Sequence, residues 1–346
     1  MTDKLRFALV GCGSQGRYLS EALALTGQAE LVACSDVDAG AAEETARRWG
    51  YARHYADTEQ MLAEADPDAV IVAVVHDQLQ PCGLAVVDAG KHLFIEKPMA
   101  LTAAHGRVLV ERARSAGVRV MVGYTLPFLP TRVRLRQLID EGVVGDLVHV
   151  TAGQFIGPLD GWLAQPGHGG GPLLYIGTHV IYQVLDLVRR RADRVFAEVD
   201  WAATGVDDAC LFTVRFEGGL VAQIGTSQNI GGRYGWLDVL GSAGRLRSEW
   251  ERGEIFVQST VVDAYGDPTT ILVPEEATGP AVEHGRMASP TGFRYVRAWA
   301  AEFAEFIAAI REGRDPAVTG DDAVGVLEIT DAVFESGRTG QVVDVC

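Results

Sequence analysis

The chain has 346 residues, too many for one ordinary hydrophobic core, so its length favours two domains. Its 30 Lys and Arg residues against 46 Asp and Glu residues give a formal net charge of −16, and such a surface repels phosphate backbones, so we expect no nucleic-acid partner. The five cysteines are odd in number and scattered, without CxxC pairs or thiol–histidine spacings, which argues against a disulfide scaffold and a zinc site.

The first third of the chain alternates short apolar runs with longer amphipathic stretches, a pattern typical of a parallel sheet covered by helices. The expected strands are 5–10, 31–35, 69–75, 92–95 and 119–122, and the expected helices are 14–25, 39–49, 79–89 and 103–115, closed by glycines at 27, 50, 90 and 117. No apolar run approaches the roughly 20 residues of a bilayer span, and no signal-peptide core precedes the first strand. We therefore expect a soluble, cytoplasmic protein with no membrane partner and no metal.

A glycine-rich loop follows the first expected strand and opens the first helix. It reads Gly11-Cys12-Gly13-Ser14-Gln15-Gly16, the GxGxxG pattern of dinucleotide sites. There the first Gly makes the turn, the second admits the pyrophosphate and the third packs helix on strand, while the helix N-terminus attracts the phosphates. Taken alone, the pattern could equally be an ordinary tight turn; its place after a strand favours the cofactor.

An acidic residue follows the second expected strand. Asp36 stands 20 residues after Gly16, where a carboxylate accepts hydrogen bonds from the adenosine ribose. Residues 37–46 contain no Arg or Lys to neutralise a 2′-phosphate, so NAD is favoured over NADP. The alternative is that Asp36 caps the next helix, although Asp38 could serve that purpose instead.

Beyond Gly123 the pattern changes to strands without intervening helices. We expect a helix at 131–140, strands at 147–154, 194–201, 209–216, 221–226 and 236–240, and helices at 171–188 and 295–311 packed on their sheet. The predicted fold class is α/β: a Rossmann domain over 1–124 with a doubly wound parallel sheet, and a substrate-binding and oligomerisation domain over 125–346 with a large open, mostly antiparallel sheet.

Two further motifs carry a family resemblance. The segment 89–98, AGKHLFIEKP, resembles the AGKHxxxEKP signature of the Gfo/Idh/MocA oxidoreductases, and 167–179, GHGGGPLLYIGTH, is similar to their GGGxLxDxGxH segment. The resemblance also reaches the end of the chain, where 316–345 looks like the family's last helix and closing strand. It implies a Rossmann domain followed by an α/β domain whose open sheet often forms oligomers, here a homodimer or homotetramer.

The resemblance also implies site residues. In the family the EKP lysine contacts substrate and nicotinamide ribose, its proline is usually cis, and the motif histidine is the usual acid/base, which correspond here to Lys97, Pro98 and His179. Glu96 belongs to the same cofactor segment, and His76, where the family often has Asn, is expected near the nicotinamide. The chemistry is consistent, since imidazole titrates near neutrality and an ammonium stabilises a developing alkoxide.

A helix starting at Gly171-Pro172 would place Tyr175, His179, Tyr182 and Asp186 on one face. Without the resemblance, such a His and two Tyr would more often be core residues. Family members usually carry Asp in place of Tyr175, and often also in place of Tyr182. His179 is then a weaker base unless Asp186 or a main-chain carbonyl orients it, and Tyr175 shares the acid role with Lys97.

Other departures bear on the substrate. The family often has Tyr-Asn-Arg-Arg-Phe where this chain has Tyr124-Thr125-Leu126-Pro127-Phe128, and losing two arginines argues against an anionic ligand. Candidate pocket walls are Tyr124, Phe128, Phe155 and Trp162, though such aromatics are more often core. Tyr124, Trp162, Tyr175 and Tyr182 are the residues expected to bind substrate.

These observations predict an NAD-dependent oxidoreductase that moves a hydride between nicotinamide and a secondary hydroxyl or ketone of a sugar, glycoside or cyclitol. One alternative is an enzyme that retains NAD and cleaves a glycosidic bond through transient oxidation. Another is a sensor that kept the cofactor fold and lost catalysis, although Lys97 and His179 argue against it.

Overall fold

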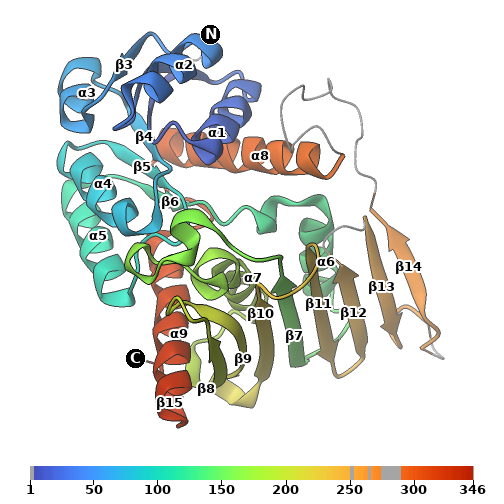
Figure 1. Cartoon of the computed structure of the whole chain (residues 1–346). Helices are drawn as coiled ribbons and strands as arrows, with labels where there is room; N and C mark the ends of the chain where they lie inside the picture. The colour runs from blue at the N-terminus through green and yellow to red at the C-terminus, as the bar shows by residue number, and fades with distance from the viewer. Residues whose placement is uncertain (1–3, 250–252, 264–265, 274–289, 346) are drawn as a thin grey trace. The chain divides into compact units, whose positions relative to one another are not determined.

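A computed structural model describes residues 4–249, 253–263, 266–273 and 290–345. The chain divides into two compact units, Met1–Thr125 with His284–Val324, and Leu126–Glu283 with Gly325–Cys346. Figure 1 shows the elements of both units in chain order by colour. Within the described residues, no helix combines the length and apolarity needed to cross a membrane.

The first unit is built on a six-stranded parallel sheet of strand order β3-β2-β1-β4-β5-β6, the order of a doubly wound dinucleotide-binding fold. Its strands are β1 (Leu5–Val10), β2 (Ala29–Ser35), β3 (Arg53–Tyr55), β4 (Ala69–Val72), β5 (His92–Ile95) and β6 (Val120–Val122). Its helices are α1 (Ser14–Leu25), α2 (Ala39–Trp49), α3 (Thr58–Ala65), α4 (His76–Asp88), α5 (Ala103–Ala116) and α8 (Pro290–Glu312). The predicted fold class is confirmed, and the four glycines expected to close helices all have positive φ.

The prediction was wrong about what α8 covers. We expected this helix on the antiparallel sheet, but it packs within the first unit, alongside α1 in Figure 1. The Phe303 ring lies 4.6 Å from that of Phe94 on β5, and the Phe306 ring lies 6.3 Å from that of Phe7 on β1. An amphipathic pattern shows that a helix has an apolar face but not which sheet that face covers.

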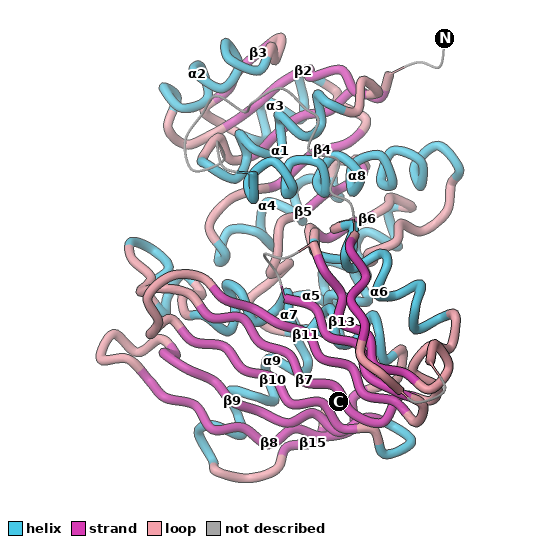
Figure 2. The backbone as a smooth tube through the Cα atoms, turned by 90° about the vertical axis from the view of Figure 1, so that its right-hand side faces the viewer, coloured by secondary structure: helices cyan, strands magenta, loops and turns pink. Residues whose placement is uncertain are grey.

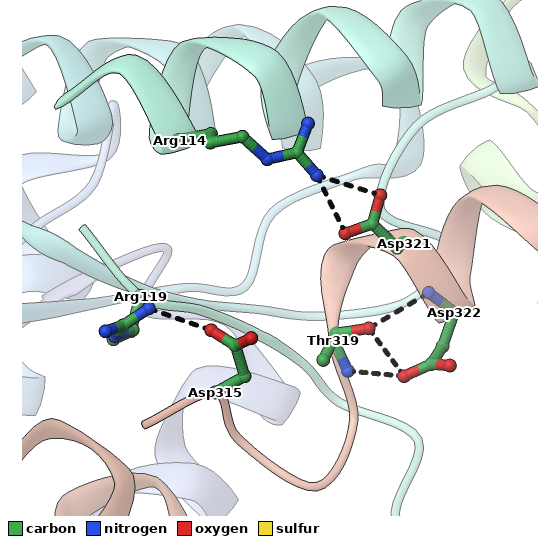
Figure 3. A network of polar contacts seen from close by, with 6 residues as sticks. All are labelled: Arg114, Arg119, Asp315, Thr319, Asp321 and Asp322. Atoms are coloured by element: carbon green, nitrogen blue, oxygen red, sulfur yellow. Dashed lines mark hydrogen bonds and ion pairs between the residues drawn. The ribbon is translucent and has the colours of Figure 1, made fainter. Parts of the chain in front are cut away.

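Polar contacts hold the segment after α8 in the same unit (Figure 3). Arg119 contacts Asp315 at 2.8 Å, and Arg114 contacts Asp321 at 3.2 Å. Thr319 caps the start of α9 (Gly320–Thr339), because its hydroxyl accepts from the Asp322 backbone N–H. These charged pairs are exposed and contribute at most about 1 kcal/mol each, so apolar packing supplies most of the attachment.

The second unit contains a nine-stranded sheet of order β14-β13-β12-β11-β7-β10-β9-β8-β15, in which only β7 and β10 of the described pairs run parallel. Its strands are β7 (Leu147–Phe155), β8 (Ala192–Trp201), β9 (Asp207–Phe216), β10 (Val221–Ser227), β11 (Tyr234–Gly241), β12 (Gly244–Glu249), β13 (Glu254–Ser259), β14 (Thr269–Leu272) and β15 (Val343–Asp344). Its α-helices are α6 (Pro130–Asp140), α7 (Thr178–Val188) and most of α9. The last three strands before α8 had no sequence prediction.

No helix of the described residues covers one face of this sheet, as Figure 2 shows for the side towards the viewer. Leu211 is 63% exposed there, and the rings of Phe155 and Trp236 stack 5.4 Å apart. A Cβ on Gly153 would meet the Trp236 ring at 2.5 Å, so this glycine lets the ring lie flat on the strand. Phe155 therefore lies on the open face, next to Trp236, and its role as a pocket wall stays a prediction.

Candidate functional site

The glycine-rich loop forms a cradle at the end of β1. Gly11 has φ +96°, and a Cβ there would come within 2.2 Å of the Ala73 carbonyl oxygen. A Cβ on Gly16 would come within 1.9 Å of the Gly11 carbonyl oxygen, so this glycine lets α1 pack closely on the strand. A Cβ on Gly13 would meet nothing within 4 Å, so open space lies in front of the loop, and Gly13 and Ser14 are exposed. These observations fit a pyrophosphate group at the N-terminus of α1.

Two side chains hold the cradle. The Asp36 carboxylate accepts from the Cys12 backbone N–H at 2.7 Å, and the Arg17 guanidinium donates to the Cys12 carbonyl at 3.0 Å. The Cys12 thiol is fully buried beneath the loop. Asp36 therefore orders the loop, a function that its spacing in the sequence did not predict.

The acid that caps α2 is Asp38. Its Oδ1 accepts from the Gly40 and Ala41 backbone N–H groups, at 2.9 and 3.2 Å. The alternative in which Asp36 caps this helix is therefore wrong. Asp36 lies half-buried at the end of β2, and the next side chain, Val37, is 97% exposed.

The segment after β5 is tied directly to the loop. Gln15 donates from its side-chain amide to Glu96 Oε1 at 2.7 Å, and Glu96 Oε2 accepts from the Lys97 backbone N–H at 3.2 Å. Burial raises the pKa of Glu96, although the nearby Lys97 charge and the Gln15 bond oppose this. The Lys97–Pro98 peptide is cis, and the Lys97 side chain is half-buried.

Two other predicted residues of the first unit are covered. His76 begins α4 and is 4% exposed, and Tyr124, which follows β6, is fully buried. The structure thus brings the loop, Gln15 and Glu96 together at the carboxyl ends of the strands, where ligands bind in open α/β folds.

In the second unit, Tyr175 and His179 lie on consecutive turns of different type. The predicted regular helix over 171–188 was wrong in its first turn, because Leu173–Gly177 is a π-helix and α7 starts at Thr178. π-turns are frequent at functional sites. Tyr175 and His179 are half-buried, whereas Tyr182 is 4% exposed.

The π-turn is held by a residue that sequence reasoning missed. Asp207 at the start of β9 is 1% exposed, and its Oδ2 accepts from the Leu173 backbone N–H at 2.8 Å. Burial raises the pKa of Asp207 to about 6, although the bonds from Leu173 and Cys210 oppose this. A Cβ on Gly171 would lie 2.0 Å from Asp207 Oδ1, so this glycine makes room for the carboxylate. The signal in the sequence was a pair of acidic residues, Asp207 and Asp208, directly before the expected strand 209–216.

Asp186 is one of the groups expected to orient His179. Its carboxylate forms an ion pair with Arg136 on α6. Trp162 lies in a short 3₁₀ turn, Gly161–Ala164, and is half-buried. The predicted residues therefore fall into two sets, one in each unit: the cofactor set with Lys97, and the set of Tyr175, His179 and Tyr182.

The comparisons with known proteins agree with this geometry. Residues 5–124 match a family described as "Oxidoreductase family, NAD-binding Rossmann fold", and residues 133–247 match the "GFO/IDH/MocA C-terminal domain". The chain is 27% identical to the 1,5-anhydro-D-fructose reductase of Ensifer adhaerens, with 98% of each chain covered, and 27% identical to the inositol 2-dehydrogenase of Rhizobium meliloti (strain 1021), with 96% of each covered. Among solved structures, a levoglucosan dehydrogenase in complex with NADH and L-sorbose superposes with a TM-score of 0.89 over 100% of both chains at 24% identity, which shows a shared fold.

Proposed function

The chain belongs to the Gfo/Idh/MocA family of NAD-binding oxidoreductases, and we propose that it interconverts a secondary hydroxyl and a ketone on a sugar, glycoside or cyclitol. The observation that carries the proposal is the Gln15–Glu96–Lys97 linkage, which joins the phosphate loop to the lysine that follows β5. It supports a role for Lys97 at the reacting end of the cofactor rather than at the protein surface.

The cofactor would be held by groups already ordered in the first unit. The N–H groups at the start of α1 donate to phosphate oxygens, for which the open space at Gly13 leaves room, and Asp36 accepts from ribose hydroxyls. His76, Glu96 and Pro98 belong to the same proposed cofactor set. Bound nicotinamide supplies the acceptor or donor of the hydride.

The residues of the chain handle the proton and the charge on oxygen. In the oxidation direction, His179 accepts the hydroxyl proton, since neutral imidazole is a base near neutrality. The Lys97 ammonium stabilises the alkoxide that develops, and the Tyr175 hydroxyl donates a hydrogen bond to the same oxygen. In the reduction direction the same groups return the proton to the new hydroxyl.

The proposed substrate is uncharged and partly apolar. Residues 125–127 contain neither of the two arginines that the family often has there. Trp162 and Tyr175, both half-buried, are proposed to contact the ligand together with Tyr124 and Tyr182. Tyr182 is 4% exposed and Tyr124 is fully buried, so the two half-buried side chains offer most of the contact area. A glycoside or cyclitol fits this set better than a sugar acid.

The direct test is absorbance at 340 nm with NAD and a panel of cyclitols, free sugars and glycosides. Production of NADH with at least one member of the panel supports the proposal. Release of aglycone without net NADH would instead support the alternative of glycoside cleavage with retained NAD. NAD binding without any turnover across the panel would contradict the proposed reaction.

A preference for NAD over NADP is proposed from Asp36. Replacing Asp36 by Asn keeps an acceptor for the Cys12 N–H but removes the charge, so we expect NADH affinity to fall about tenfold and the ratio of NADPH to NADH affinity to rise. Fluorescence titration with both cofactors measures this. The control is Asp38→Asn, which alters the helix cap two residues away and should leave the ratio unchanged. Equal ratios in wild type and Asp36→Asn would refute the assignment.

The open sheet face is proposed to form a homodimer or homotetramer. Leu211, Tyr234 and Phe196 are 63%, 43% and 38% exposed on this sheet, an apolar surface of the kind that a second subunit covers. We expect Leu211→Lys to lower the mass measured by multi-angle light scattering, and Val108→Lys, at a 46% exposed site on α5, to leave it unchanged. A monomeric wild-type protein would contradict this proposal.

We propose a cytoplasmic location, and this prediction rests on the five scattered cysteines of the sequence.

A further inference from the structure

A second carboxyl group lies buried behind the Gln15–Glu96–Lys97 linkage. Glu302 is on α8, which neither matched family region covers, and it is 0% exposed. Its Oε2 accepts from the Thr125 hydroxyl at 3.1 Å. Its Oε1 accepts no hydrogen bond from any residue that the structure describes. A charge at this place would have one neutral hydrogen-bond donor among the described residues, which is costly in the interior of a protein.

Glu96 is the neighbouring acid, and its surroundings differ. The two oxygens of Glu96 accept from the Gln15 amide and from the Lys97 backbone N–H, and the Lys97 charge favours its ionised form. Gly123 leaves space for it, since a Cβ there would lie 3.3 Å from the Glu96 carboxyl carbon. Of the two acids, Glu96 is therefore the better placed to carry the charge.

Burial and the Glu96 charge together raise the pKa of Glu302 well above its usual value, against a small opposing effect of the Thr125 bond. Residues 123–125 link the two acids, because Gly123 lies against the Glu96 carboxyl group and Thr125 donates to Glu302. In a dry site, one charged carboxyl group disfavours ionisation of a second one nearby. The oxygen that accepts no bond is then where the proton of Glu302 resides.

We propose that Glu302 is a positioning residue of the cofactor site, protonated and neutral beside the charged Glu96. It fixes the carboxylate that holds Gln15 in the phosphate loop and the backbone of Lys97. The linkage then runs from α8 through Glu96 to both ends of the proposed cofactor site. This inference rests on the proposed NAD site but not on any choice of substrate.

The test is the dissociation constant of NADH, measured by quenching of tryptophan fluorescence in the full chain without substrate. Glu302→Gln keeps a neutral donor and acceptor and should bind NADH within about twofold of wild type. Glu302→Met keeps the length and burial but no hydrogen bond, so Glu96 loses its support and we expect binding about tenfold weaker. Glu305→Met is the control, because Glu305 lies on the same helix but pairs with Arg314 at the surface.

The measured affinities distinguish failure of the inference about Glu302 from failure of the proposed function. Wild-type affinity in Glu302→Met would show that Glu302 only fills space, and a loss of more than fivefold in Glu302→Gln would show that its charge is needed; either result overturns the inference. Circular dichroism shows whether Glu302→Met folds. If it does not, the NADH affinity of Glu302→Gln decides alone, and a loss of more than fivefold overturns the inference. Failure of wild type itself to bind NADH would instead overturn the proposed function.

Discussion

Replacing Lys97 by Met should lower kcat about 100-fold or more while NADH binding changes little. Methionine keeps the unbranched chain and removes the ammonium, so the variant lacks the positive charge that stabilises an alkoxide. The Lys97 backbone N–H still donates to Glu96, which keeps the cofactor segment in place. Initial rates at 340 nm with the best substrate of the panel, together with NADH titration, measure both quantities.

Lys91→Met is the matched control for Lys97→Met. Lys91 precedes the same strand, β5, and its ammonium pairs with Asp66 at the surface. Its removal should leave kcat unchanged. A Lys97→Met enzyme with a near-normal rate would remove Lys97 from the proposed mechanism and would favour a surface role for its charge.

Replacing His179 by Ala should lower kcat by a similar factor, about 100-fold to 10,000-fold, and should also change the pH profile. In the wild type we expect oxidation to slow as pH falls, because protonated His179 cannot accept a proton. The variant lacks this group, so the acid limb should disappear from a plot of kcat/KM against pH.

His105→Ala provides the comparison for this second variant, since His105 lies exposed in the first turn of α5. It should retain both the rate and the acid limb. Persistence of the limb in His179→Ala would assign the titration to another group. Asp207, with a pKa raised to about 6 and a bond to the π-turn that precedes His179, is then the next group to replace.

The elements that could be predicted from the sequence are those in which local pattern and burial agree. The apolar run of β1, the glycine loop and the amphipathic α1 follow one another with limits that match the structure. The short edge strand β3 was missed, because Arg53 and His54 are exposed and three residues give no periodicity. α3 was missed together with it, although Asp57 caps that helix by accepting from Gln60.

What could not be predicted depends on partners distant in the chain. The π-turn before His179 depends on Asp207, more than 30 residues later, and the pairing of Asp186 with Arg136 joins two helices. The sequence contains one indication of the role of Glu302. It is an acidic residue within the buried stripe of α8 that contains Phe303 and Phe306. A polar residue in such a stripe indicates a buried polar contact, but sequence alone does not name its partner.

The placement of α8 also affects how the chain folds during synthesis. When the ribosome has made the first 125 residues, all six strands of the parallel sheet exist, but Phe7 and Phe94 still lack the rings of Phe306 and Phe303. At about 5–20 residues per second, residues 290–324 follow roughly 10–40 seconds later. Until then the apolar face of the nascent sheet that α8 covers stays open, and the dinucleotide-binding unit is completed only when residues 290–324 have been made.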